Sequence, residues 1–165
     1  NSRAPQHGLP RMNPPLRTED DRQAAVAAVC DGTISAVATD HAPHTTQDKA
    51  RPLTDAPFGI VGLETAVALC LTEFYHTGRI TLPTLIARFT AGPAAALGLN
   101  PASLAEGSPA DITVIDPDTP WTVDAARFVS KAHNCPYHDR RCKGRPIATM
   151  VGGKWAFTSP GLLPG

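Results

Sequence analysis

The chain has 165 residues, and its 15 lysines and arginines are balanced by 15 aspartates and glutamates. This length suffices for one domain of ordinary size or for parts of two. Because the charge is balanced, nothing attracts the whole chain to nucleic acid or to an anionic membrane surface. No apolar run approaches the roughly 20 residues of a membrane span, and the N-terminus lacks a signal-peptide pattern. These features predict a soluble cytoplasmic protein, and 17 prolines with few aromatic residues make it rich in loops.

The first predicted elements are a helix and a strand. Thr18 and Asp21 resemble a capping box, the acidic residues between them favour the start of a helix, and Gly32 can end it. Residues 34–39 form an apolar run that predicts a strand buried on both faces, and Pro43 prevents that strand from continuing. A helix followed by a buried strand is half of a βαβ repeat, which indicates an α/β fold.

Asp40 follows directly on this predicted strand. In parallel α/β folds the carboxyl ends of the strands are where ligands bind and chemistry occurs. Asp40 is therefore the first candidate functional residue, and the alternative is a helix or turn cap.

Three helices are predicted in the middle of the chain, after a polar loop at residues 45–57 of a length typical of binding loops or lids. They cover residues 62–76, about 82–90, and 93–97. The first has Leu63, Val67, Leu71 and Phe74 on one face.

The pattern changes to β near residue 102. Residues 110–116 and 121–123 predict strands, and residues 147–151 and 154–157 flank the Gly-Gly signal of a tight hairpin. We therefore expect an α/β part over residues 1–101, an all-β part over residues 102–165, and an unstructured tail from residue 158.

Four motifs, in order and with closely matching spacings, resemble the C-terminal part of a class I dihydroorotase. They are residues 12–17 (Met-Asn-Pro-Pro-Leu-Arg), 39–44 (Thr-Asp-His-Ala-Pro-His), 57–65 (Pro-Phe-Gly-Ile-Val-Gly-Leu-Glu-Thr) and 107–112 (Gly-Ser-Pro-Ala-Asp-Ile). Dihydroorotases are metal-dependent members of the amidohydrolase superfamily. The first two motifs together separate them from the similar hydantoinases and allantoinases.

The resemblance implies a particular architecture. Residues 1–101 would be the C-terminal portion of a (β/α)8 TIM-like barrel, with residues 34–39 as its last strand. Residues from about 102 would be part of a small β-sandwich domain. Composition alone does not choose a barrel over a doubly wound sheet.

The resemblance also implies a reaction, the reversible hydrolysis of the cyclic amide of dihydroorotate to N-carbamoyl-aspartate in de novo pyrimidine biosynthesis. Asp40 would be a ligand of a catalytic divalent metal, usually zinc, and the general acid/base. A metal-bound hydroxide would attack the ring amide, and the Asp40 carboxylate would take the proton and return it to the ring nitrogen.

Four further residues match the family's substrate-binding positions. Asn13 and His44 would hold the substrate carboxylate and ring, with an arginine from another part of the enzyme. The backbone of Phe58 and Gly59 would contact the pyrimidine ring, where a glycine permits close approach. His41 is expected to pack or hydrogen-bond beside the site. The alternatives are a rigid Pro-Pro connector after Asn13, a surface-loop histidine at position 44 and a core phenylalanine at position 58.

A separate cluster contains His133, Cys135, His138 and Cys142. Four soft ligands could bind a structural zinc, but their spacing fits no common pattern and the neighbouring basic residues would repel a cation. With Cys30 and Cys70 included, the cysteines lack the regular spacing of a disulfide framework, so we expect reduced thiols.

Other metal ligands of the family are missing from this sequence. Dihydroorotases carry a His-x-His-x-Arg motif on the first barrel strand and further ligands on middle strands, whereas the only histidine before His41 is His7. A catalytic metal needs about three protein ligands. We therefore expect that these residues do not catalyse the reaction alone, and that the chain is a fragment of a longer enzyme or a truncated product that self-associates or needs a partner.

Two other functions stay open at this point. One is a non-catalytic structural or assembly partner of aspartate transcarbamoylase, and the other is a ring opener like hydantoinase or allantoinase. The presence of Asn13, Asp40, His44 and the Phe58-Gly59 pair favours the enzyme, because a purely structural remnant has no physical need for that set.

Overall fold

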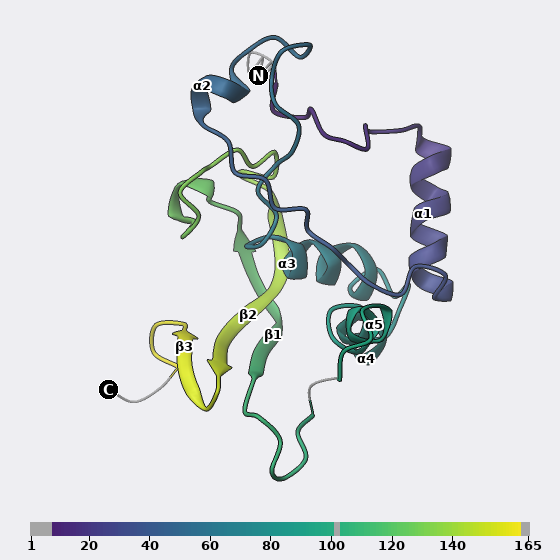
Figure 1. Ribbon diagram of the computed structural model, residues 1–165, viewed down its shortest axis with the longest axis vertical. Coiled ribbons are helices and arrows are strands. Elements are labelled where there is room, and N and C mark those ends of the chain that lie inside the picture. The colour runs from purple at the N-terminus through teal and green to yellow at the C-terminus, as the bar shows by residue number, and fades with distance from the viewer. Residues whose placement is uncertain (1–7, 101–102, 163–165) are drawn as a thin grey trace. The chain divides into compact units, whose positions relative to one another are not determined.

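The computed structural model describes residues 8–100 and 103–162 (Figure 1). These residues fall into two compact units. The first unit consists of the described residues up to 27, Ala38–Ala66 and Thr122–Arg141; the second consists of the other described residues. The boundary expected between residues 101 and 102 lies outside the described residues.

Helix α1 (Glu19–Asp31) confirms the predicted first helix and its cap. The backbone N–H of Thr18 donates to Asp21 Oδ2 at 3.2 Å, and the N–H of Asp21 donates to Thr18 Oγ1 at 3.3 Å. This reciprocal pair satisfies two donors that the helix leaves without partners. Gly32, with φ of 95°, follows the helix in a conformation that favours glycine.

The predicted strand at residues 34–39 is wrong, because the structure has irregular backbone there. A parallel strand forms only beside neighbouring strands, and within the described part of the chain the one sheet is built from other residues. The segment is tied by single bonds instead, such as that from Val37 N to Arg88 O at 2.9 Å.

The three helices expected in the middle of the chain are confirmed, with shifted ends. They are α3 (Ala66–Cys70) continuing into η1 (Leu71–Tyr75), then α4 (Leu82–Ala87) and α5 (Ala91–Ala96). η1 is π-helical, and the N–H of His76 reaches back five residues to Leu71 O at 2.9 Å. Leu63 precedes the helix and is 63% exposed, so its predicted place on the buried face is wrong.

The polar loop also holds a short helix, α2 (Thr46–Lys49), that the pattern did not predict. None of the described helices has the length and apolar character needed to cross a membrane.

The sheet contains β1 (Ile112–Thr122), β2 (Arg141–Val151) and β3 (Lys154–Thr158), in the order β1-β2-β3. β2 and β3 pair antiparallel as the predicted hairpin, with Val151 opposite Lys154. The two strands expected at residues 110–116 and 121–123 are one strand, which tolerates prolines because it lies at the edge of the sheet. A 3-10 helix, η2 (Ala125–Arg127), follows β1. The chain is therefore an α/β protein with a three-stranded sheet.

In the second unit the helix containing η1 packs against the strands. Leu71 is fully buried, and a Cβ built on Gly144 would lie 2.7 Å from its Cδ1 atom, so only glycine allows this approach. Thr72 Oγ1 accepts from Lys143 N at 2.9 Å. In the first unit the buried residues include Val61, Thr65, Val123 and Ala125.

Candidate active site

Two motif segments lie side by side in the first unit, and we name them by their key residues. The Asp40 segment comprises residues 39–44, and the Phe58 segment comprises residues 57–63. The N–H of Ala42 donates to Ile60 O at 2.9 Å. A Cβ built on Gly62 would lie 3.0 Å from Thr39 O, so the glycine permits the close approach of the two chains. The structure thus brings together motifs that are well separated in the sequence.

Asp40 is exposed and has φ of 45°. Positive φ is uncommon for residues other than glycine, although aspartate tolerates it better than most, and such conformations cluster at functional sites. The cap role considered for Asp40 is not seen, because the nearby helix α2 is capped by Thr45, which accepts from Asp48 N at 3.1 Å. Asp40 is therefore exposed to solvent, and its positive φ has to be maintained by the contacts of the Asp40 segment.

His41 secures the backbone beside Asp40, as expected. Its Nδ1 atom accepts from the N–H groups of Gly62 at 3.1 Å and Leu63 at 3.3 Å. An atom that accepts cannot carry the proton, so the neutral ring is protonated on Nε2, which lies 3.5 Å from Ser130 Oγ. His41 therefore joins the Asp40 segment to the Phe58 segment.

His44 and Phe58 also contact each other across the two segments. His44 is half-buried, and its Nε2 atom lies 2.7 Å from Phe58 O. A carbonyl oxygen only accepts, so His44 donates from Nε2 and leaves Nδ1 for other partners. The Phe58 side chain is 51% exposed with the Arg11 guanidinium 4.3 Å from its ring centroid, so the core alternative for Phe58 is wrong.

Gly59 is buried and can only be glycine in this arrangement. Its φ is +108°, and a Cβ there would lie 2.4 Å from Ala42 Cβ. Its N–H donates to Arg11 O at 2.9 Å, and its carbonyl oxygen accepts from Lys49 Nζ at 2.9 Å. Both backbone groups of Gly59 are already bonded within the chain, so neither is left without a partner. The role of Gly59 is to let the Phe58 segment lie close to the Asp40 segment.

Lys49 is a site residue that the sequence pattern missed. It is 5% exposed, and Nζ donates to the carbonyls of Arg11 at 3.3 Å, Pro57 at 3.0 Å and Gly59 at 2.9 Å. Burial, with a smaller contribution from the Arg11 charge, lowers the pKa of Lys49 below its ordinary value. Three carbonyls match the three donors of an ammonium group. A lysine in a polar loop gives no signal of this role, because such residues are mostly solvated.

Asn134 is the second residue missed, and its amide contacts both segments. It lies 90 residues beyond His44 in the chain, so no local pattern connects it to the motifs.

Asn13 is exposed and belongs to the same unit. Among the described residues no hydrogen bond joins it directly to the other predicted site residues. Asn13 is connected to those residues through Arg11, two positions earlier in the chain, whose carbonyl oxygen accepts from Gly59 N and Lys49 Nζ. The structure therefore gathers Asp40, His44, Phe58 and Gly59, with Asn13 on a connected stretch of chain.

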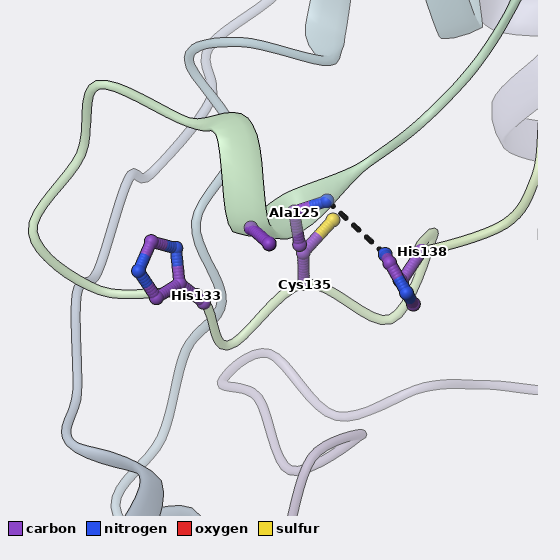
Figure 2. Close-up of a pocket in the computed structure, with 5 residues that line it drawn as sticks. Ala125, His133, Cys135 and His138 are labelled. Atoms are coloured by element: carbon purple, nitrogen blue, oxygen red, sulfur yellow. Dashed lines mark hydrogen bonds between the residues drawn. The ribbon is translucent and has the colours of Figure 1, made fainter.

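Three residues of the histidine and cysteine cluster, His133, Cys135 and His138, line a pocket of about 240 Å³ together with Ala125 and Ala126 (Figure 2). His133 and His138 flank the buried Cys135 in this view, and His138 Nδ1 accepts from Ala125 N at 3.1 Å. No disulfide joins any of the four cysteines in the structure, and their reduced state stays a prediction. Over residues 8–100 and 103–162, no three of the histidines, cysteines, aspartates and glutamates are grouped to hold a metal ion. One exposed carboxylate, Asp40, does not make a metal site, so these residues do not fit a catalytic metal by themselves.

The sequence matches the amidohydrolase family over residues 5–156. The chain therefore belongs to the amidohydrolase family, whose members are generally metal-dependent hydrolases. The resemblance that the four motifs indicated is confirmed by curated relatives named dihydroorotase. The chain is 48% identical to that of Halalkalibacterium halodurans over 144 residues, which are 87% of this chain and 34% of the relative. It is 50% identical to that of Bacillus caldolyticus over 143 residues, again 87% of this chain and 34% of the relative.

A solved structure shares the fold. The L-hydantoinase (dihydropyrimidinase) of Arthrobacter aurescens is 30% identical with a TM-score of 0.84, over 93% of this chain and 35% of that one. The chain spans about a third of the length of the curated relatives that it matches.

Proposed function

We propose that the whole protein carrying these residues is a dihydroorotase, which hydrolyses the cyclic amide of dihydroorotate reversibly to N-carbamoyl-aspartate. One observation carries the proposal. The segment with Asp40 and His44 and the segment with Phe58 and Gly59 are hydrogen-bonded to each other, inside a chain that is about half identical to dihydroorotases. The similarity to dihydroorotases supports the reaction, and the contact between the two segments supports the proposal that these residues act together.

In this proposal Asp40 moves the proton. Ring opening needs a base that takes a proton from the attacking water and an acid that gives one to the ring nitrogen. A carboxylate that is exposed beside a substrate site can do both in turn. Asp40 would also be one ligand of the metal, for which we propose zinc, and the remaining ligands would come from residues other than those described.

The other residues would recognise the substrate. Dihydroorotate carries a carboxylate, and the proposal assigns it to His44 and Asn13. Because Nε2 of His44 is bonded to Phe58 O, the group left to meet the substrate is Nδ1, which donates when the ring is protonated. Phe58 and Gly59 would form the wall against which the ring lies, and the glycine at position 59 lets the Asp40 segment approach that wall closely.

The proposed architecture follows the same similarity. Residues 1–101 would form the last part of a (β/α)8 barrel and residues 102–165 part of a β-sandwich.

The experiment is a dihydroorotate hydrolysis assay on the full-length protein and on its Asp40→Asn variant. We expect turnover by the wild type and a loss of at least about 100-fold in kcat for the variant, because general acid/base groups contribute on that scale. An active wild type with an equally active variant would remove Asp40 from the mechanism. An inactive wild type with zinc supplied would overturn the proposed function.

A second candidate is a cyclic amidase acting on hydantoins or dihydropyrimidines, which the fold of the Arthrobacter hydantoinase favours. Turnover of hydantoin or dihydrouracil in preference to dihydroorotate would support it. If the whole protein instead bound aspartate transcarbamoylase and turned over none of these substrates, it would be a non-catalytic assembly partner.

A further inference from the structure

Asn134 lies between the two site segments and bonds to both. It is 6% exposed. Its Oδ1 atom accepts from His44 N at 3.1 Å, while Nδ2 donates to Ala42 O at 2.9 Å and to Gly59 O at 3.4 Å. Its own backbone carbonyl accepts from Val61 N at 3.3 Å. A single residue therefore connects the backbone of the Asp40 segment to that of the Phe58 segment.

An asparagine side chain suits this position better than any other. The pattern needs one acceptor and two donors on a short, uncharged group, and the primary amide supplies them. An aspartate would have the same shape but no donors, and it would place a carboxylate against two carbonyl oxygens. A glutamine would need room for another methylene in a buried place, and an apolar residue would leave buried backbone groups without partners.

The loop that carries Asn134 is itself anchored to the Phe58 segment and its continuation. The Glu64 carboxylate accepts from the N–H groups of Val129 at 2.9 Å and Ser130 at 3.1 Å. Most of the Asp40 and Phe58 segments is neither helix nor strand, so no regular ladder sets their separation. Their spacing depends on a few bonds that cross directly, from Ala42 N and the rings of His41 and His44, and on Asn134. Asn134 makes two side-chain bonds to the Asp40 segment and one to the Phe58 segment.

We propose that Asn134 is a positioning residue of the active site. Asn134 holds the backbone of His44 and of Gly59. It thereby fixes the position of the His44 imidazole, which would bind the substrate carboxylate, relative to Phe58 and Gly59, which would contact the pyrimidine ring. Asn134 acts through those two residues and does not touch the substrate. This inference rests on the proposed function, because it names the residue that aligns that site.

The kinetic test compares Asn134→Asp with Asn100→Asp in the full-length enzyme. Both variants make the same chemical change, but Asn100 is exposed and lies in the second unit. We expect KM for dihydroorotate to rise roughly tenfold in Asn134→Asp while kcat stays within about threefold, because misaligned binding groups weaken substrate binding first. Asn100→Asp should keep both values. A fall in kcat at unchanged KM, in proportion to the fraction of folded protein, would overturn the proposal, because it would show a merely structural role.

A second measurement does not depend on activity. We expect the amide hydrogen of His44 to exchange faster in Asn134→Asp than in Asn100→Asp, while the Arg22 amide in α1 keeps its rate. Should Asn134→Asp not fold, Asn134→Ser retains an uncharged polar group and should show the same two effects in milder form. If the wild-type protein does not turn over dihydroorotate, the proposed function fails. The exchange rate of the His44 amide still tests whether Asn134 holds the His44 backbone. Unchanged exchange at His44 would overturn the inference whatever the activity.

Discussion

The β2–β3 hairpin and the candidate active site are built in opposite ways. In the hairpin, neighbours in the sequence are neighbours in space, and Gly152 and Gly153 adopt φ of 54° and 78° to connect two strands that pair through their backbones. In the site, the two segments pair through few backbone bonds. Their positions depend also on side chains that bond to carbonyl and N–H groups of other segments, namely those of His41, His44, Lys49 and Asn134.

This difference has a physical consequence. A backbone ladder tolerates most side-chain changes, because its bonds do not involve side chains. A site held by buried side chains loses its geometry when one of them changes, because buried polar groups then lose their partners. A substitution in the hairpin should therefore lower the free energy of unfolding alone. A comparable substitution in the site should also change the kinetics of the enzyme.

The largest effect is expected for Gly59→Ala in the full-length protein. The new Cβ would meet Ala42 Cβ and would require a positive φ, so the Asp40 segment has to move. A displacement of about 1 Å can cost on the order of 100-fold in rate, and we expect kcat/KM to fall by at least that much. Gly98→Ala is the matched control, because Gly98 also has positive φ, +65°, but has nothing within 4 Å of its Cβ position. Equal losses in the two variants would mean that backbone conformation, not contact between the segments, causes the effect.

The next largest effect is on stability, in Lys49→Met. The apolar side chain fills similar space but removes one donor from each of the carbonyls of Arg11, Pro57 and Gly59. Arg11 O keeps the Gly59 N–H and Gly59 O keeps Asn134 Nδ2. The Pro57 carbonyl is therefore the one whose stated donor is lost. A buried unsatisfied group costs roughly 1–3 kcal/mol, so we expect a loss of about 2 kcal/mol in the free energy of unfolding, measured by urea denaturation. Lys131→Met changes an exposed lysine of the same unit and should cost little. A Lys49 variant as stable as the Lys131 variant would show that the three bonds contribute nothing net.

The same comparison explains how much the sequence could predict. The hairpin, the capped helix α1 and the helices after residue 62 follow from local patterns, because capping, periodicity and the Gly-Gly turn act over a few residues. The motif residues Asp40, His44, Phe58 and Gly59 could be named from resemblance. Lys49 and Asn134 could not, because their roles depend on contacts with residues distant in the sequence. The strand expected at residues 34–39 was wrong for a related reason, since strands depend on neighbours that local sequence does not specify.

A smaller effect is expected for Gly153→Ala at the hairpin. Gly153 has φ of +78°, and its Cβ position is open, so the substitution adds backbone strain without a clash. We expect a loss of about 1 kcal/mol in the free energy of unfolding. KM for dihydroorotate should stay at the wild-type value, because none of the residues assigned to the site belongs to the hairpin. A raised KM would contradict the expectation that a change in the hairpin alters stability alone.

The smallest effect concerns the exposed start of α1, where local interactions act without burial. Hydrogen bonds from Arg22, and next from Gln23, hold the pKa of Glu19 at about 2, below its ordinary value of 4.5. Because the folded pKa is the lower one, this interaction stabilises the helix fully above pH 4.5 and is lost as the pH falls toward 2. An NMR titration of the Glu19 carboxyl group should show the low pKa in the full-length protein, and Arg22→Ala should raise it toward 4.5. Arg17→Ala is the control, because Arg17 pairs with Asp21 and not with Glu19. A Glu19 pKa unaffected by Arg22→Ala would show that even this short-range pair is too well solvated to act, and that α1 depends on its Thr18 cap instead.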